Sequence, residues 1–107
     1  MKISEGDKIF IQDTLMPWAG VARLRLAYSE SKAKWPDIWV STNGIPTITI
    51  TDEWRSHDTH LRRSQLVHEF LHLRGMEHGK LSNLNFSTYP GKDTYSKAVY
   101  QDIINGR

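Results

Sequence analysis

Residues 68–78 constrain the fold of this chain more than any other feature of its sequence. They read His-Glu-Phe-Leu-His-Leu-Arg-Gly-Met-Glu-His and fit the pattern H-E-x-x-H-x-x-G-x-x-H at every fixed position. His68 and His72 are four residues apart, so on a helix their side chains project from the same face. Gly75 follows where a left-handed backbone would end the helix and turn the chain back. The pattern therefore predicts a helix ending at Gly75 and a loop that brings His78 to the two helical histidines.

The histidines of this pattern have the donor chemistry of a metal site. Three imidazole nitrogens suit Zn²⁺, and they leave a fourth tetrahedral position open to water, as in catalytic rather than structural zinc sites. Glu69 is rotated roughly 100° from His68 along a helix, which places its carboxylate beside the metal and not on it. There it can take a proton from water and act as a general base. We expect one catalytic Zn²⁺ held by His68, His72 and His78, with Glu69 as the catalytic residue.

The residues before the motif favour the helix that the motif requires. Apolar side chains such as Val67 and Phe70 recur at helical spacing over residues 59–74. Asp58 or Thr59 can cap the start of this helix. We therefore expect the two helical histidines to lie near the C-terminal end of a regular helix.

The rest of the chain alternates between helix and strand patterns. Ser4 can cap a first helix, which Pro17 is expected to end. Asn43 and Gly44 tolerate positive φ and predict a turn between two strands. The expected elements are a helix at 5–16, strands at 21–28, 37–41 and 47–51, the motif helix, and a helix at 93–104. This order predicts an α+β domain with a short mixed sheet, an active-site helix and a C-terminal helix.

The third strand has the clearest period-two pattern. Thr47–Thr51 places its isoleucines on one face and its threonines on the other, as expected for a half-buried strand. Such a strand could lie at the edge of a sheet. We predict an exposed edge strand beside the metal, which holds substrate or inhibitor antiparallel to itself.

Composition limits the class of protein. The chain has 107 residues and no cysteine, so it can build one core but has neither disulfides nor thiolate ligands. Its net charge of +2 is spread over interleaved acids and bases, and the basic pair Arg62 and Arg63 is interpreted as a solvated helix face. A nucleic-acid partner is therefore not expected. No apolar run could span a bilayer and no signal peptide is recognisable, so we expect a single cytoplasmic, monomeric domain over residues 1–107 with no membrane partner.

Residues 68–78 resemble the motif of the metzincin clan of zinc peptidases, which includes matrixins, astacins and serralysins. The resemblance implies a small metzincin-like domain, a zinc metalloendopeptidase that hydrolyses peptide bonds of a peptide or protein substrate. In that clan an edge strand forms one wall of the cleft and pairs with the extended substrate. The resemblance assigns this role to residues 45–51.

The chain departs from the clan in its methionine turn, because no methionine follows His78. The segment containing Ser87, Thr88 and Tyr89 looks like the matrixin turn with Thr88 in place of methionine. In a second register Ser87 takes that place, and Tyr89 matches the tyrosine that astacins and serralysins place near the metal, where it could stabilise an oxyanion. Both registers are compatible with the sequence.

The same stretch is also similar to the bacterial endoribonuclease family of ribosomal RNA maturation. That family has the same histidine spacing, and Leu71, Leu73 and Gly75 match it as well. It lacks the glutamate after the first histidine, so Glu69 favours peptide hydrolysis. A metal-dependent endoribonuclease and a non-catalytic domain stabilised by zinc are the alternatives.

Two further histidines precede the motif helix. His57 and His60 are interpreted as solvated residues of a loop or a helix start and are placed outside the site.

Overall fold

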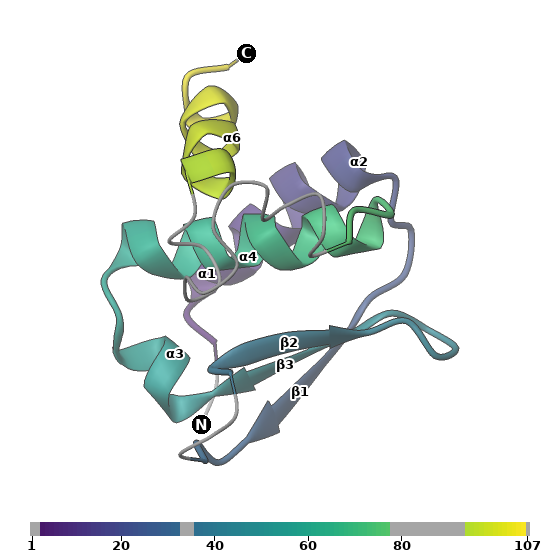
Figure 1. The fold of residues 1–107 in the computed structure, drawn as a ribbon, viewed down its shortest axis with the longest axis vertical. Helices are drawn as coiled ribbons and strands as arrows, with labels where there is room; N and C mark the ends of the chain where they lie inside the picture. Colours follow the sequence, from purple (N-terminus) through teal and green to yellow (C-terminus); the bar gives the residue numbers. More distant parts are fainter. Residues whose placement is uncertain (1–2, 33–35, 78–93, 107) are drawn as a thin grey trace.

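The computed structural model of this protein describes residues 3–32, 36–77 and 94–106. Helices cover one face of a small sheet, and the C-terminal helix rises away from the helix nearest the sheet (Figure 1). In chain order the elements are α1 (Glu5–Ile9), the π-helix η1 (Phe10–Leu15), α2 (Met16–Ala19), β1 (Arg25–Ser29), β2 (Ile38–Ser41), β3 (Thr47–Thr51), α3 (Asp52–Ser56), α4 (Thr59–Leu73) and α6 (Thr94–Ile104). The α+β class and the mixed sheet are as predicted.

The N-terminal helical segment continues through Pro17, so the prediction that Pro17 ends it is wrong. The backbone widens into a π-helix over Phe10–Leu15, and the N–H of Met16 bonds to the carbonyl of Ile11. This wider turn leaves room for the proline ring, which in a regular α-helix would collide with the carbonyl four residues before it. The helix ends instead at Gly20, whose φ of 69° is left-handed.

The first strand is shorter than the predicted residues 21–28. The N–H of Val21 bonds to the carbonyl of Met16 at 2.9 Å and completes the end of the preceding helix. Val21 therefore lies outside the sheet, and β1 begins only at Arg25. The other predicted helices and strands agree with α4, α6, β2 and β3 to within one residue at each end.

The strand β3 is central in the described sheet, whose order is β1-β3-β2. It pairs in parallel with β1 and antiparallel with β2, so Ile48 lies between Leu26 and Val40. The prediction that Thr47–Thr51 is an exposed edge strand is therefore wrong, and so is the substrate-pairing role of residues 45–51. The alternation of isoleucine and threonine indicates which face of a strand is buried. Central strands and edge strands can both show this pattern, so it does not identify an edge. The edge strand that contacts α4 is β2.

The core lies between the helices and the inner face of the sheet. Ile48 and Ile50 of β3 are fully buried, as are Leu66 and Phe70 of α4. The whole core cluster is Phe10, Ile11, Leu15, Ile38, Ile48, Ile50, Trp54, Leu66, Val67, Phe70, Leu71 and Tyr100. Burying one large aliphatic or aromatic side chain contributes roughly 1.5–3 kcal/mol. The apolar residues that predicted α4 therefore anchor it along its inner face.

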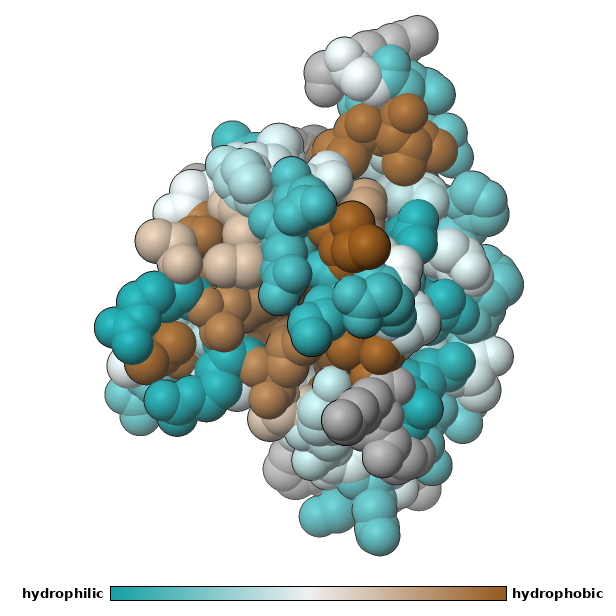
Figure 2. All heavy atoms as spheres, turned by 180° about the vertical axis from the view of Figure 1, so that it is seen from behind, coloured by the Kyte–Doolittle hydropathy of each residue, from teal (hydrophilic) through white to brown (hydrophobic). Residues whose placement is uncertain are grey.

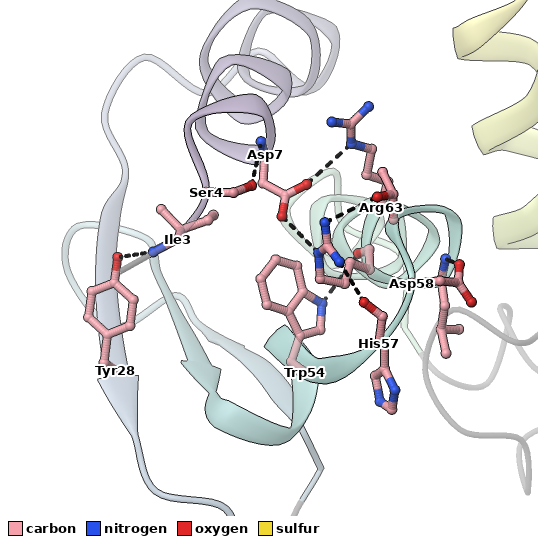
Figure 3. Close-up of polar contacts among 11 residues, drawn as sticks. Ile3, Ser4, Asp7, Tyr28, Trp54, His57, Asp58 and Arg63 are labelled. Carbon is pink, nitrogen blue, oxygen red and sulfur yellow. Dashed lines mark hydrogen bonds and ion pairs between the residues drawn. The ribbon is translucent and has the colours of Figure 1, made fainter. Parts of the chain in front are cut away.

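A buried ion-pair network joins α1 to α4 (Figure 3). Asp7 is 1% exposed, and its carboxylate accepts hydrogen bonds from Nε of Arg62 at 2.8 Å and Nε of Arg63 at 3.3 Å. The indole N–H of Trp54 donates to the carbonyl of Arg62 at 3.3 Å, which adds α3 to the network. The interpretation of the two arginines as a solvated helix face is therefore wrong. Sequence spacing alone does not reveal a partner more than fifty residues away.

Apolar side chains on the far side of the molecule lie in separate groups between hydrophilic ones (Figure 2). Among the described residues, the large hydrophobic side chains that are exposed are those of Ile9, Tyr28 and Ile104. No helix within residues 3–32, 36–77 and 94–106 combines the length and the apolar character needed to cross a membrane.

Candidate metal centre

Both ends of α4 are fixed by the residues that the sequence predicted. At the start, the carboxylate of Asp58 accepts a hydrogen bond from a backbone N–H of the first turn at 3.0 Å. At the end, Gly75 adopts a φ of 94° and donates its N–H to the carbonyl of His72 at 2.9 Å. The N–H of Met76 closes the same turn. The helix therefore stops just after His72, and the chain folds back across its end.

The imidazoles of His68 and His72 point toward one another from consecutive turns of α4. Their Nε2 atoms are 3.2 Å apart, and the two rings are inclined by 79°. Two nitrogens bound to one tetrahedral Zn²⁺ at ~2.0–2.1 Å would be separated by about 3.3 Å. The two Nε2 atoms therefore already have the separation of ligands to one ion.

The other ring nitrogen of each histidine contacts an oxygen. Nδ1 of His72 lies 2.7 Å from the carbonyl oxygen of Met76, and Nδ1 of His68 lies 3.4 Å from Oγ of Ser96 on α6. A carbonyl can only accept, so Nδ1 of His72 is the donor in this contact, and in the neutral imidazole Nε2 keeps its lone pair. An oxygen partner on the second ring nitrogen is the usual arrangement for histidines that bind metals.

Glu69 lies beside this pair and is almost completely buried. Its Oε2 atom is 3.9 Å from Nε2 of His68, and the residue is 4% exposed. Burial raises the pKa of Glu69 from 4.5 to about 8, while a hydrogen bond from the backbone N–H of Val40 opposes the shift. The carboxyl group is therefore held close to the two imidazoles and has a raised proton affinity.

A cleft of about 560 Å³ opens in front of Glu69 and His72. One wall is the edge strand β2, and another is the turn after α4. The carbonyl of Asp37 points toward β3, where it accepts a hydrogen bond from the N–H of Thr51. Backbone groups of successive strand residues point to opposite sides, so the N–H and carbonyl groups of Ile38 and Val40 point away from β3. This direction agrees with the contact between the N–H of Val40 and Glu69. The outer edge of β2 therefore borders the cleft.

The described lining of the cleft is mostly apolar. It consists of Pro36, Ile38, Trp39, Val40, Thr42, Glu69, His72, Gly75, Met76 and Glu77. Apolar side chains and two glutamates therefore surround the histidines, and neither lysine nor arginine occurs among these lining residues.

The structure brings together three of the four predicted site residues. The candidate ligand atoms of His68, Glu69 and His72 all lie within 4.8 Å of one another. The predicted third ligand, His78, lies outside the described residues, as do Ser87, Thr88 and Tyr89 of the two possible turn registers. Sequence reasoning did not foresee the contacts of Ser96 and Val40, because neither belongs to a local motif.

His57 lies before α4 and His60 in its first turn, and both make polar contacts, although His60 is exposed. Nε2 of His57 lies 2.8 Å from Oδ2 of Asp37, and Nδ1 of His60 lies 3.0 Å from the hydroxyl oxygen of Tyr100. Asp37 and His57 form a second possible ligand group with Glu53, which is exposed. The contact between Asp37 and His57 joins the start of β2 to the segment between α3 and α4. The interpretation of His57 as a solvated loop residue is therefore wrong.

The residues at the centre fit zinc better than an alkaline-earth ion. Two converging imidazole nitrogens are ligands that Zn²⁺ accepts readily, whereas Ca²⁺ and Mg²⁺ prefer sites made of oxygen atoms. Comparison of the chain with protein-family models, curated protein sequences and solved structures gives no match.

Proposed function

We propose that this protein is a zinc-dependent endopeptidase of the metzincin type, in which Glu69 is the general base. One observation carries the proposal. The Nε2 atoms of His68 and His72 lie 3.2 Å apart with the carboxylate of Glu69 3.9 Å from the first of them, at a cleft bordered by an edge strand. A metal-binding pair, a base and a place for an extended chain thus occur together.

Glu69 has the position and the environment of a general base. A bound Zn²⁺ would supply Lewis acidity, which makes water more nucleophilic and polarises the scissile carbonyl. Glu69 takes the proton from the attacking water and returns it to the leaving amine. Its burial raises its proton affinity, and the N–H of Val40 holds the carboxylate in place. His68 and His72 bind the ion, and the sequence pattern assigns the third ligand position to His78.

The edge strand β2 is the candidate binding site for the substrate backbone. Its outer edge borders the cleft and faces Glu69. An extended peptide can add to such an edge through main-chain hydrogen bonds, which do not depend on sequence. We propose that a substrate peptide lies along Ile38–Ser41, antiparallel to that strand. This assignment replaces the one based on Thr47–Thr51.

The composition of the described cleft lining favours a peptide over RNA. The described lining includes Glu69 and Glu77 and neither lysine nor arginine. RNA carries one negative charge per phosphate, so binding it normally requires basic side chains near the reacting bond. A purely structural zinc site normally has four protein ligands, whereas the sequence pattern assigns three histidines to this ion.

The first test is metal content. We expect one equivalent of zinc in the purified protein and none in His72→Ala, because one remaining helical histidine cannot hold the ion with the same affinity. His60→Ala is the matched control, since it removes an imidazole from the same helix away from the centre. A full equivalent of zinc in His72→Ala would show that the ligand assignment is wrong.

The second test is the substrate. Zinc-loaded protein is incubated with an unstructured protein and, separately, with a structured RNA, each with and without a chelator. We expect cleavage of the protein, no cleavage of the RNA, loss of activity with chelator and recovery with added zinc. Cleavage of RNA alone would identify a ribonuclease. Bound zinc with neither activity would identify a structural site.

A further inference from the structure

The C-terminal helix α6 contacts α4 through two hydroxyl groups that both meet imidazoles. Oγ of Ser96 lies 3.4 Å from Nδ1 of His68, and the hydroxyl oxygen of Tyr100 lies 3.0 Å from Nδ1 of His60. Ser96 and Tyr100 are four residues apart and therefore share one face of α6. His60 and His68 likewise share one side of α4. The two helices thus meet along a line that runs directly to the metal centre.

The two helical histidines receive their Nδ1 partners from different sources. For His72 the partner is the carbonyl of Met76, four residues along the chain, which the turn at Gly75 brings into place. For His68 the partner is a hydroxyl group from a helix that lies 28 positions further along. The orientation of His72 is therefore a local property of α4, whereas that of His68 depends on the docking of α6.

Ser96 is placed where a hydroxyl group has a specific use. It is fully buried, at 0% exposure, and a buried hydroxyl is unfavourable unless it is hydrogen-bonded. When Nδ1 of His68 donates to Oγ of Ser96, the lone pair of Nε2 is directed toward Nε2 of His72. The hydroxyl therefore holds the ring orientation of His68, and by accepting from Nδ1 it can support the tautomer in which Nε2 binds an ion.

We infer that Ser96 is a positioning residue of the metal centre, which orients His68 and couples ion binding to the docking of α6. This inference rests on the proposed function, because it assigns a role within the same centre. Partners of this kind typically contribute 10–100-fold to metal affinity. Ser96 acts through His68 and is not itself assigned a contact with the ion or the substrate.

The test compares metal affinity among serine variants of the full chain. Zinc and cobalt affinities are measured by competition with a chromophoric chelator for wild type, Ser96→Ala, Ser96→Thr and Ser64→Ala. Ser64 is the matched control, because it is also buried, lies one turn before His68 on α4 and lines the same junction with α6 as Tyr100. We expect Ser96→Ala to bind zinc about 10–100-fold more weakly, Ser96→Thr to recover most of the loss, and Ser64→Ala to bind like wild type.

Two further measurements separate positioning from a loss of packing. The visible spectrum of the cobalt-loaded protein reports the ligand geometry, and we expect Ser96→Ala to change it while Ser64→Ala does not. The melting temperature of each chelator-treated variant reports packing alone. Zinc affinity and a cobalt spectrum equal to those of wild type in Ser96→Ala would overturn the inference. If Ser96→Ala bound zinc more weakly and the wild-type protein cleaved no peptide, the role of Ser96 would be supported and the proposed peptidase activity would be contradicted.

Discussion

Glu69 is a carboxylic acid in the interior of the protein, and its burial opposes ionisation. Desolvation raises its pKa to about 8, and the hydrogen bond from Val40 compensates only in part. Groups with strongly shifted pKa values are concentrated at functional sites, where a raised proton affinity serves acid–base chemistry. A cation bound by the two neighbouring imidazoles would lie close enough to favour the ionised form of Glu69.

This burial predicts a pH dependence of stability for the metal-free protein. The pKa of Glu69 is about 8 in the folded state and near its ordinary value of 4.5 in the unfolded state. The folded state therefore binds more protons between these values, and its stability falls as pH rises from about 4.5 to about 8. The whole contribution is at most about 5 kcal/mol, at ~1.4 kcal/mol per pKa unit.

The measurement is denaturant unfolding across this pH range in the presence of a chelator, for wild type and Glu69→Gln. The two proteins differ only at position 69, so the difference between the two curves isolates Glu69. We expect the free energy of unfolding of wild type to fall relative to that of the variant as pH rises. Parallel curves would contradict the raised pKa.

The predicted site residues that the structure brings together are those whose positions one helix determines. His68 and Glu69 lie near His72 because side chains four and three positions apart on a helix are neighbours. The contacts of Val40 and Ser96 come from a strand and a helix that are distant in the chain. Helical spacing contains no information about them, so they could not be predicted in this way.

Secondary structure followed the sequence pattern more closely than sheet order did. The bounds of β3 were predicted correctly, yet its place in the sheet was wrong, because period-two alternation distinguishes faces and not edges. The short helix α3 was not predicted, although Thr51 caps it by accepting from the N–H of Trp54. The extension through Pro17 depends on a π-helical turn, which has no simple sequence signal.

The turn after α4 predicts a selective effect of Gly75→Ala. At a φ of 94° a side chain costs about 1–2 kcal/mol of strain, and a Cβ at this position would meet no atom within 4 Å. Relief of the strain would move the carbonyl of Met76 away from His72. We therefore expect both a lower free energy of unfolding and weaker zinc binding.

Gly44→Ala is the control for this prediction. Gly44 also has a positive φ, of 83°, and open space around it, but it lies in the turn between β2 and β3. We expect a similar loss of stability with unchanged zinc affinity, measured by the same chelator competition. Equal zinc affinities in the two alanine variants would contradict the role assigned to the turn at Gly75.

The described part of the molecule is organised around α4, which contributes to the core on one side and to the candidate metal centre on the other. Its apolar residues pack on the sheet, its arginines bind α1, and its histidines contact α6 and the cleft. Because these contacts share one helix, the centre is positioned only when the surrounding elements have docked. Ion binding should therefore stabilise the whole fold and not one loop.

The network between α1 and α4 predicts a large effect of Asp7→Asn. The substitution leaves the partly buried guanidinium groups of Arg62 and Arg63 without their anion. Breaking a buried ion pair costs about 3–5 kcal/mol, and the partial exposure of the arginines places this variant near the lower end, at about 3 kcal/mol. Asp13→Asn, an exposed residue of the same helical segment, should change the free energy of unfolding by less than about 0.5 kcal/mol. Equal urea midpoints for the two variants would show that the network contributes nothing to stability.

The most direct test of the proposed function is peptide hydrolysis by Glu69→Gln at equal zinc content. Glutamine keeps the size of the side chain but cannot accept the proton, so zinc should remain bound at one equivalent. General-base catalysis contributes ~100- to 10,000-fold, and we expect kcat to fall by at least the lower value with a much smaller change in KM. Hydrolysis that persisted within a few-fold of wild type, at unchanged zinc content, would contradict the assignment of Glu69 as the base and the peptidase mechanism built on it.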